Sequence, residues 1–337
     1  MKLCTFEFAT PLGPAQRVGV RTPAGIVDAS AARIAFLEKT LPPAVAVRVG
    51  EAQVPSEMIA LIGSGKCAME WLTEAVAHAA DSGQQTTARG QKVLYMEKDI
   101  RLLAPVPHPP GMANFSVWPE HSVTASARGF HVTPNAAGAR VMPYWKGNPG
   151  SIVGPGAVLD FPPYASELDV ECELVCIVGT GGKNLDRAAA EQAIAGYSIL
   201  NDVSAREIQL IEKKAGRGAS KGKDFDGGNV MGPWLVTPDE VGDIRSLRVS
   251  LHVNGEELSG AETSGMVWDF AEMLSYLSLG QTVHPGQVIS GGCYPKGSAM
   301  DLDRKLSPGD QVELRISKVG ALTCRLGPKP QVIAYPL

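Results

Sequence analysis

Three carboxylates in two apolar segments have the spacing of a metal site. Glu171 and Glu173 lie two residues apart in an alternating apolar run that predicts a strand, so both side chains leave the same face. Asp202 ends a second apolar run, YSILND. Three oxygen ligands that converge from two strands, with positions left for water or substrate, suit a hard divalent cation such as Mg²⁺. The pattern therefore predicts a metal-dependent active site.

The same spacing has a structural explanation, because charged residues that alternate along a strand most often form a solvated face. Two observations favour the metal site. Glu171 and Glu173 are surrounded by Leu, Val, Cys and Ile, among which unpaired carboxylates would be costly to bury. The third carboxylate is followed closely by Arg206, Gln209 and Lys223, polar groups that could stabilise negative charge beside a metal.

Two short helices are expected to position these groups. Asp186 can cap a helix that runs to Ala195, between the two strands. Ser204 is expected to cap the next helix, which would place Arg206 and Gln209 three residues apart on one face.

Composition limits the classes of protein that this chain can belong to. A length of 337 residues suits two domains or one large one, and 44% apolar residues can form a sizeable core. A net charge of −4 gives no support for a nucleic-acid partner or an anionic membrane surface. The six cysteines include no CxxC pair, and no signal peptide or long apolar span is evident. We expect a soluble cytoplasmic protein that acts on a small molecule.

The N-terminal third carries no convergent chemistry. Residues 2–30 predict short strands, residues 31–80 predict helices, and residues 90–103 are again extended. Four prolines between positions 105 and 110 exclude a helix there, so we place a domain boundary at about Ala104. The role expected for this part is packing, or covering the mouth of a site.

The two expected domains are an accessory domain over residues 1–104 and a catalytic domain over residues 105–337. In the last third, Asn254–Gly255 fits a type I′ hairpin turn, and residues 267–280 have the spacing of a core helix. Two Pro-Gly pairs each precede a predicted strand. Such an antiparallel-rich mixture with few helices favours an α+β fold over a doubly wound sheet.

Other candidate residues are weaker when taken alone. A lone His such as His121 more often has a structural role than a catalytic one. Cys293 could be a nucleophile, but no His partner is evident in the sequence. The GTGGKN segment at 179–184 lacks the first Gly and the Ser or Thr of a P-loop, so it is interpreted as a turn.

Taken in order, several motifs resemble the fumarylacetoacetate hydrolase family over roughly residues 100–320. The matching motifs are LLAPVP, VECEL, GYSILNDVSARE, GKDFD with GPWLVT, and the PGQ and PGD turns. The resemblance implies a mixed β-roll catalytic domain of the fumarylacetoacetase type with a smaller N-terminal domain. It also implies a bound Mg²⁺, with Mn²⁺ or Ca²⁺ as alternatives, and a homodimer.

The resemblance also assigns roles to individual residues. It implies three metal ligands: Glu171, Glu173 and Asp202. It implies three residues around the substrate's oxygens: Arg206, Gln209 and Lys223. His121 resembles the base that activates water, and Arg128 and Tyr144 resemble substrate contacts.

The sequence departs from the family pattern at several positions. Asn114 stands where fumarylacetoacetase has a further Asp ligand, and Ser116 stands where it has a Tyr. A Thr of the family is replaced by Gly227, and its Ser-Gly-Thr motif ends here in Gly292. The Glu that partners the His has no evident counterpart, because Thr124 occupies the position that shorter members use.

Together with the candidate residues, the resemblance implies a metal-dependent hydrolase that cleaves a carbon–carbon bond in an acylpyruvate or a related 1,3-dicarbonyl or 2-oxo acid, in aromatic or related carbon catabolism. The alternative is a lyase or isomerase in which the metal stabilises an enolate of the substrate but no water attacks it: a decarboxylase, a tautomerase or a sugar-acid dehydratase. The missing partner of His121 keeps that alternative open. A third possibility is a metal-binding protein that has lost catalysis and binds a ligand or partner.

Overall fold

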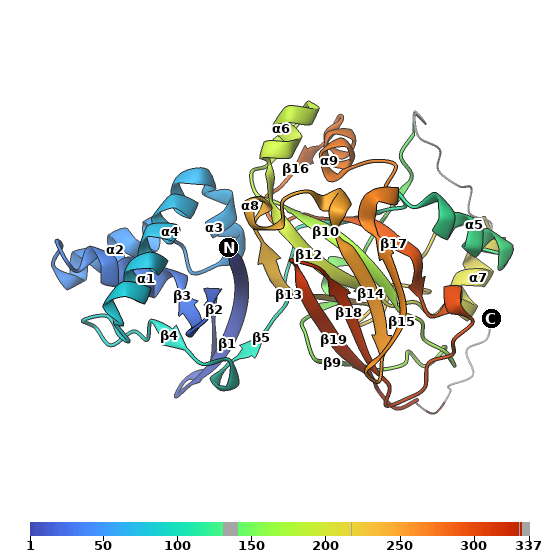
Figure 1. The fold of residues 1–337 in the computed structure, drawn as a ribbon, viewed down its shortest axis with the longest axis horizontal. Helices are drawn as coiled ribbons and strands as arrows, with labels where there is room; N and C mark the ends of the chain where they lie inside the picture. Colours follow the sequence, from blue (N-terminus) through green and yellow to red (C-terminus); the bar gives the residue numbers. More distant parts are fainter. Residues whose placement is uncertain (131–140, 217, 330, 332–337) are drawn as a thin grey trace.

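The computed structural model describes residues 1–130, 141–216, 218–329 and 331 of the chain (Figure 1). The molecule is elongated, with the N-terminal residues at one end and a larger body of sheets at the other. Helices and antiparallel-rich sheets are both substantial, so the predicted α+β class is confirmed. None of the helices in the described part of the chain combines the length and apolarity needed to cross a lipid bilayer.

The largest sheet of the described residues has 12 strands. Its main path runs in the order β4 (Leu94–Tyr95), β3 (Gly25–Asp28), β2 (Gly13–Thr22), β1 (Lys2–Thr10), β13 (Asn229–Val236), β12 (Ile194–Asp202), β10 (Glu171–Val178), β17 (Val288–Ser298), β6 (Met112–Phe115) and β7 (Tyr144–Lys146). Two further strands pair beside this path, β5 (Arg101–Leu102) with β1 and β8 (Ile152–Val153) with β13. Every residue of β10 and β13 is buried, as expected for strands that are covered on both faces.

A second sheet packs against β10, β12, β13 and β17 of the first one (Figure 1). Its five described strands follow the order β15 (Glu256–Glu262), β14 (Arg248–Val253), β18 (Gln311–Ile316), β19 (Gly320–Leu326) and β9 (Ala157–Leu159). A small pair is formed by β11 (Gly182–Lys183) and β16 (Thr282–Val283). Ile199 of the first sheet and Leu251 and Leu314 of the second belong to one apolar core. Asn254 and Gly255 both have positive φ, as a type I′ turn requires.

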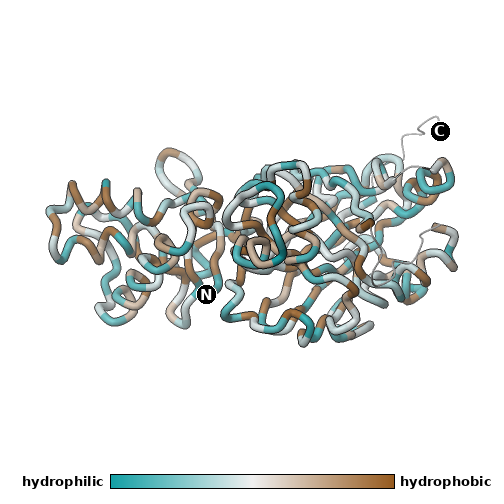
Figure 2. Tube along the Cα trace, turned by 90° about the horizontal axis from the view of Figure 1, so that it is seen from above, coloured by the Kyte–Doolittle hydropathy of each residue, from teal (hydrophilic) through white to brown (hydrophobic). Residues whose placement is uncertain are grey.

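The helices of the N-terminal end pack on one another, and the first of them also packs on β2 and β3. They are α1 (Ala29–Leu37), α2 (Pro43–Gln53), α3 (Met58–Gly63) and α4 (Gly65–Ser82). On α4 the buried residues Ala68, Leu72 and Ala75 recur at helical spacing, so one face of the helix packs inward. The colours of Figure 2 accordingly alternate between hydrophobic and hydrophilic along the turns at this end.

The N-terminal strands belong to the same sheet as β13, β12 and β10. β1 pairs antiparallel with β13, with Leu3 opposite Leu235, so backbone hydrogen bonds connect the two parts of the chain. The cluster that contains Leu3 also contains Leu200 of β12. A domain boundary at Ala104, between residues 1–104 and 105–337, stays a prediction.

Further helices lie in the part of the chain that follows β6. They are α5 (Pro119–Ala127), α6 (Arg187–Gln192), α7 (Arg206–Lys214), α8 (Pro238–Val241) and α9 (Phe270–Ser278). Short 3₁₀ turns are η1 (Glu97–Asp99), η2 (Pro149–Ser151), η3 (Ile244–Ser246), η4 (Thr263–Gly265) and η5 (Met300–Leu302). The predicted core helix is α9, which starts with a capping box between Asp269 and Glu272.

Two details of the predicted helices are wrong. Ser204 does not cap α7: its Oγ donates to the carbonyl of Asp202, and Ala205 occupies the N-cap position without a side-chain bond. Asp186 does cap α6, but the helix ends at Gln192 because the chain joins strand β12 from Ile194. The predicted shared face of α7 is confirmed by a 2.8 Å bond from Arg206 Nη1 to Gln209 Oε1.

Candidate metal centre and active site

The three predicted carboxylates converge in the protein interior. Glu171 and Glu173 start β10, Asp202 ends the neighbouring β12, and all three residues are at most 5% exposed. One oxygen from each lies within 4.8 Å of the others. The register between β10 and β17 shifts on both sides of Glu173, where the regular ladder is interrupted. Because the three residues are buried, they do not form the solvated strand face that was the alternative explanation.

Two cations, the buried Lys223 and the partly buried Arg206, contact these carboxylates directly. Lys223 Nζ donates to Glu171 Oε2 and, at 2.6 Å, to Asp202 Oδ2. Arg206 Nη2 donates to Glu171 Oε1 at 2.7 Å, and Arg206 Nε donates to Asp169 Oδ2 at 2.7 Å. Asp169 was not predicted, although it precedes Glu171 by two residues and continues the same alternation along the chain. Extending the strand pattern upstream could have found it.

The charges around the three carboxylates set their ionisation. Burial alone would raise the pKa of Glu171, but the charges of Arg206 and Lys223 outweigh burial and hold that pKa well below its usual range. Burial raises the pKa of Glu173 well above its usual value, and the charges of Asp202 and Glu171 raise it further. Burial also raises the pKa of Asp202, to about 6, against the opposing charge of Lys223. If all three carboxylates were ionised, their negative charge would exceed the positive charge of Arg206 and Lys223, and a bound cation would favour these ionised forms.

The residues fit a divalent cation with oxygen ligands. Asp202 Oδ1 is fully buried and has no hydrogen-bond partner among the described residues. Such an unsatisfied acceptor is costly in a protein interior unless a bound group uses it. Asn114 Nδ2 donates to Glu173 Oε2 at 2.9 Å and to Asp202 Oδ2 at 3.0 Å, and Ser290 Oγ donates to Glu173 Oε2 at 2.5 Å. The Asn that replaces a family Asp therefore orients two carboxylates in this structure.

His121 has an acidic partner that the sequence analysis missed. His121 Nδ1 lies 2.9 Å from Oδ2 of Asp301, whose side chain is fully buried. Because a carboxylate accepts, Nδ1 carries the proton and Nε2 keeps its lone pair. Nε2 faces the centre, 3.8 Å from Glu171 Oε1. No local pattern could connect His121 with Asp301, since 180 residues separate them and only the approach of α5 to η5 brings them together.

A cavity of about 450 Å³ opens onto this group. Among its lining residues are the predicted His121, Arg206, Gln209, Lys223, Tyr144 and the three carboxylates. Aromatic rings form part of the wall, where Tyr144 packs on Phe115 with ring centroids 5.0 Å apart. Arg128 is not among the described lining residues: it pairs with Asp303, with Nη1 2.6 Å from Oδ1. A contact of Arg128 with substrate stays a prediction.

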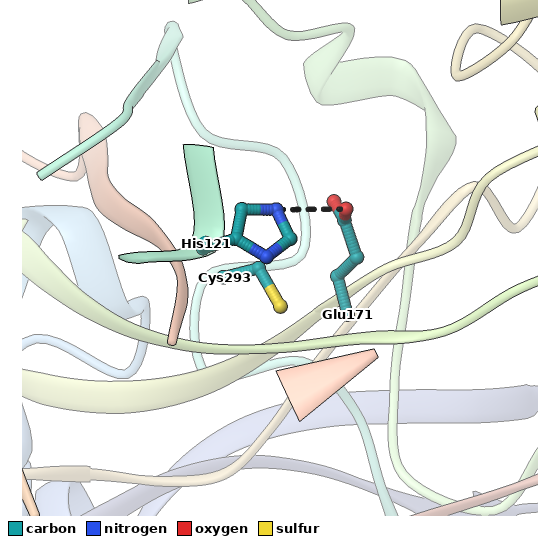
Figure 3. A group of neighbouring side chains, drawn as sticks. All are labelled: His121, Glu171 and Cys293. Carbon is teal, nitrogen blue, oxygen red and sulfur yellow. Dashed lines mark ion pairs between the residues drawn. The ribbon is translucent and has the colours of Figure 1, made fainter. Parts of the chain in front are cut away.

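Cys293 also lines the cavity, beside His121 and Glu171 (Figure 3). It is 3% exposed, and burial raises the pKa of its thiol well above the usual value, with Glu171 raising it further. Such a thiol is a poor nucleophile at neutral pH. All six cysteines are free.

The fold and the site define an α+β protein in which a buried carboxylate centre and a histidine with a buried aspartate partner meet at one cavity. The family profile described as fumarylacetoacetate (FAA) hydrolase, C-terminal, matches residues 118–327. The chain therefore belongs to the fumarylacetoacetate hydrolase family, which confirms the resemblance noted in its motifs.

Individual relatives agree with this assignment. A protein of Burkholderia multivorans, whose name goes no further than hydrolase, is 39% identical over 173 residues, which are 50% of this chain. The match spans 60% of that relative's length. Two solved structures share the fold over nearly the whole chain. A fumarylacetoacetate hydrolase from Exiguobacterium antarcticum has a TM-score of 0.69 and 24% identity, and covers 97% of this chain and 100% of its own. A maleylpyruvate hydrolase from Sphingobium, in complex with manganese(II) and pyruvate, has a TM-score of 0.67 and 22% identity, with coverage of 98% and 100%.

Proposed function

We propose that this protein is a metal-dependent hydrolase that cleaves a carbon–carbon bond in an acylpyruvate or a related 1,3-dicarbonyl or 2-oxo acid. One observation carries the proposal: His121, which contacts the buried Asp301, lines the same cavity as the Glu171, Glu173 and Asp202 carboxylates. A hydrolase of this kind needs a base for water and a centre that stabilises negative charge on the substrate, and these two groups of residues would supply them.

Glu171, Glu173 and Asp202 would hold the cation, which we propose to be Mg²⁺ or Mn²⁺, with Ca²⁺ as an alternative. When bound, such an ion supplies Lewis-acid stabilisation of negative charge on substrate oxygens. Carboxylate oxygens suit these hard ions. The manganese and pyruvate of the Sphingobium maleylpyruvate hydrolase make Mn²⁺ and pyruvate the first ligands to test.

His121 would take the proton of the attacking water at Nε2. Its Nδ1–H donates to Asp301, which fixes the tautomer and stabilises the imidazolium that forms. The hydroxide attacks the carbonyl carbon distal to the 2-oxo acid group, and the carbon–carbon bond then breaks. His121 can return the proton to the departing carbon, so that the two products are a carboxylic acid and a 2-oxo acid such as pyruvate.

The remaining polar residues would bind and orient the substrate. Arg206 and Lys223 keep Glu171 ionised and in place through their hydrogen bonds. Gln209 uses its Oε1 to accept from Arg206, so its amide N–H groups are what it can offer to a substrate oxygen. Tyr144 and Phe115 give the acyl part of the substrate an aromatic wall.

The lyase or isomerase alternative uses the same centre without water attack. It depended on the missing partner of His121, and the contact with Asp301 supports hydrolysis instead. Assays of acylpyruvates, β-diketones and 2-oxo acids with Mg²⁺ and with Mn²⁺ test the choice. We expect acylpyruvates to yield two acids. Turnover of oxaloacetate alone would contradict hydrolysis, and tight binding without turnover of any compound would indicate a ligand-binding protein.

We extend the proposal to assembly and location. The family resemblance supports a homodimer in the cytoplasm, with a role in the catabolism of aromatic or related carbon compounds. Light scattering of the purified protein tests the dimer: a mass twice that of the chain is expected, and a monomer at all concentrations would contradict it.

A further inference from the structure

We propose that His121, Cys293 and Glu171 form a second cation site in the cavity, which prefers a thiolate-binding metal such as Zn²⁺ and inactivates His121 when it is filled. The inhibitory part of this inference rests on the proposed function. The binding site itself does not, because it follows from the three side chains alone.

The three residues come from different elements and meet at one point (Figure 3). His121 lies on α5, Glu171 starts β10, and Cys293 lies on β17, paired in register with Glu173. One ligand atom of each lies within 4.8 Å of the others, and His121 Nε2 is 3.8 Å from Glu171 Oε1. Small side-chain rotations would bring a nitrogen, a sulfur and an oxygen to a common ion, because Zn²⁺ binds them at about 2.0–2.3 Å.

The surroundings favour zinc over a harder ion. Asp301 accepts from His121 Nδ1, which is the arrangement of carboxylate, histidine and metal common at zinc sites, and it leaves the lone pair of Nε2 for a ligand bond. Thiolate and imidazole are ligands that zinc prefers, whereas Mg²⁺ prefers the oxygens of Glu171, Glu173 and Asp202. The cavity beside these residues leaves room for water as a fourth ligand.

The proton balance of binding is simple. The Cys293 thiol donates to the carbonyl oxygen of Tyr294, with Sγ 3.4 Å from the oxygen. When Zn²⁺ binds, the thiol releases this proton to solvent and the sulfur donates an electron pair to the ion. No oxidant or reductant is required.

The two centres share Glu171, so their occupants interact. A zinc ion on His121 Nε2 would use the lone pair that the base needs for water. It would also draw a ligand oxygen of Glu171 away from the all-oxygen centre. Zinc should therefore inhibit the magnesium-loaded protein even when magnesium is in excess.

Cobalt(II) is the probe for the binding site, because a cobalt–thiolate bond gives a charge-transfer absorption that oxygen ligands do not give. We would add Co²⁺ to the full-length, Mg²⁺-saturated protein and to its Cys293→Ser, Cys293→Ala and Cys67→Ser variants. Cys67 is the matched control, since it is an exposed free thiol far from the cavity in sequence and not part of its described lining. The absorption is expected in the wild type and Cys67→Ser and lost in both Cys293 variants. Its absence from the wild type, or its persistence in the folded Cys293 variants, would overturn the site.

Zinc titration of turnover tests the inhibition. Each variant's rate is divided by its own rate without zinc, and melting temperatures confirm folding. Cys293→Ser should need at least roughly tenfold more Zn²⁺ for half inhibition, since even the loss of an outer partner of a zinc ligand costs 10–100-fold in affinity. Equal sensitivity of Cys293→Ser and wild type would contradict the inhibitory role. If no substrate is turned over, the proposed function fails, and the cobalt absorption still decides whether the site exists.

Discussion

Buried carboxylates occupy two contrasting settings in this molecule. Asp28, in the N-terminal part, is 3% exposed and caps α1 by accepting from the amide of Ala31 at 2.9 Å. Its nearest cation is Arg17, whose Nε lies 3.8 Å away, and burial raises the pKa of Asp28 to about 6. Glu171 is equally buried, but two cations contact it directly and hold its pKa below the usual range.

The contrast shows what keeps charge in a protein interior. Burial by itself drives a carboxylate toward its neutral form, and only close cations or hydrogen bonds reverse this. At Asp28 a structural cap is sufficient, so partial neutralisation near pH 6 does no harm. At the carboxylate centre Arg206 and Lys223 supply compensating charge to Glu171, whereas burial still raises the pKa values of Glu173 and Asp202.

Removing a ligand oxygen of the centre should have the largest effect. Glu173→Gln is expected to weaken metal binding and abolish turnover while the fold persists, as is Glu171→Gln. The Glu173 change is the cleaner one, because burial raises the pKa of Glu173 well above its usual value, so the amide resembles the neutral form of the metal-free protein. Metal titration calorimetry and turnover before and after chelation are the measurements. Full activity in Glu173→Gln, or activity unaffected by exhaustive chelation, would refute the metal centre.

Replacing the proposed base, His121, should have the second-largest effect on turnover. His121→Ala should lower hydrolysis by about 10²–10⁴-fold, the usual contribution of a positioned general base. Proton–deuterium exchange into a bound 2-oxo acid should largely remain, because the carboxylate centre is intact. Asp301→Asn tests the partner, and a smaller loss in the same direction is expected. If His121→Ala lost exchange and hydrolysis equally, His121 would act in removing the carbon-bound proton of the 2-oxo acid, or in maintaining the fold, and not specifically in activating water.

Lys223→Met tests the contribution of a buried cation, which can be compared with that of an exposed one. Turnover should fall by roughly 10²-fold. The metal-free protein should lose about 3–5 kcal/mol of stability, because Glu171 and Asp202 lose a buried partner. Added divalent cation should restore much of this loss in chemical denaturation.

The matched control is Lys305→Met, which removes an exposed ion pair with Glu167 and should leave stability nearly unchanged. Equal destabilisation by the two substitutions, or no recovery of Lys223→Met with metal, would contradict the account of the centre.

The smallest expected effect is at Asp28. Its pKa is raised from 3.8 to about 6 on folding, so the folded chain binds this proton more tightly than the unfolded chain. The stabilising contribution is full below pH 3.8 and is lost as pH rises through about 6. When the pH is lowered from 7 to 5, the free energy of unfolding of the wild type should therefore increase by about 1 kcal/mol relative to that of Asp28→Asn. Parallel denaturation curves at the two pH values measure it, and an identical pH dependence in both proteins would remove Asp28 as the cause.

The sequence was informative where chemistry and local periodicity coincide. Glu171, Glu173 and Asp202 could be placed together because strand alternation fixes which side chains share a face. The shared face of Arg206 and Gln209 follows from helix geometry in the same way.

Contacts that depend on tertiary structure could not be predicted. Asp301 reaches His121 through the packing of η5 against α5, and Cys293 reaches the cavity because β17 pairs with β10. The prediction that Ser204 caps α7 was wrong because its hydroxyl donates to the carbonyl of Asp202 instead. These outcomes are set by neighbours distant in sequence or by competing local bonds, neither of which residue spacing records.

The source of the oxygen in the products tests the central claim most directly. An acylpyruvate turned over in heavy-oxygen water by the Mg²⁺-loaded protein should give a carboxylic acid that carries one solvent oxygen in its new carboxylate, seen by mass spectrometry. The rate of this labelling should fall in His121→Ala and, to a smaller extent, in Asp301→Asn. Turnover that yields products without solvent oxygen at that carbon would show that no water attacks there. It would contradict the proposal that the protein is a hydrolase.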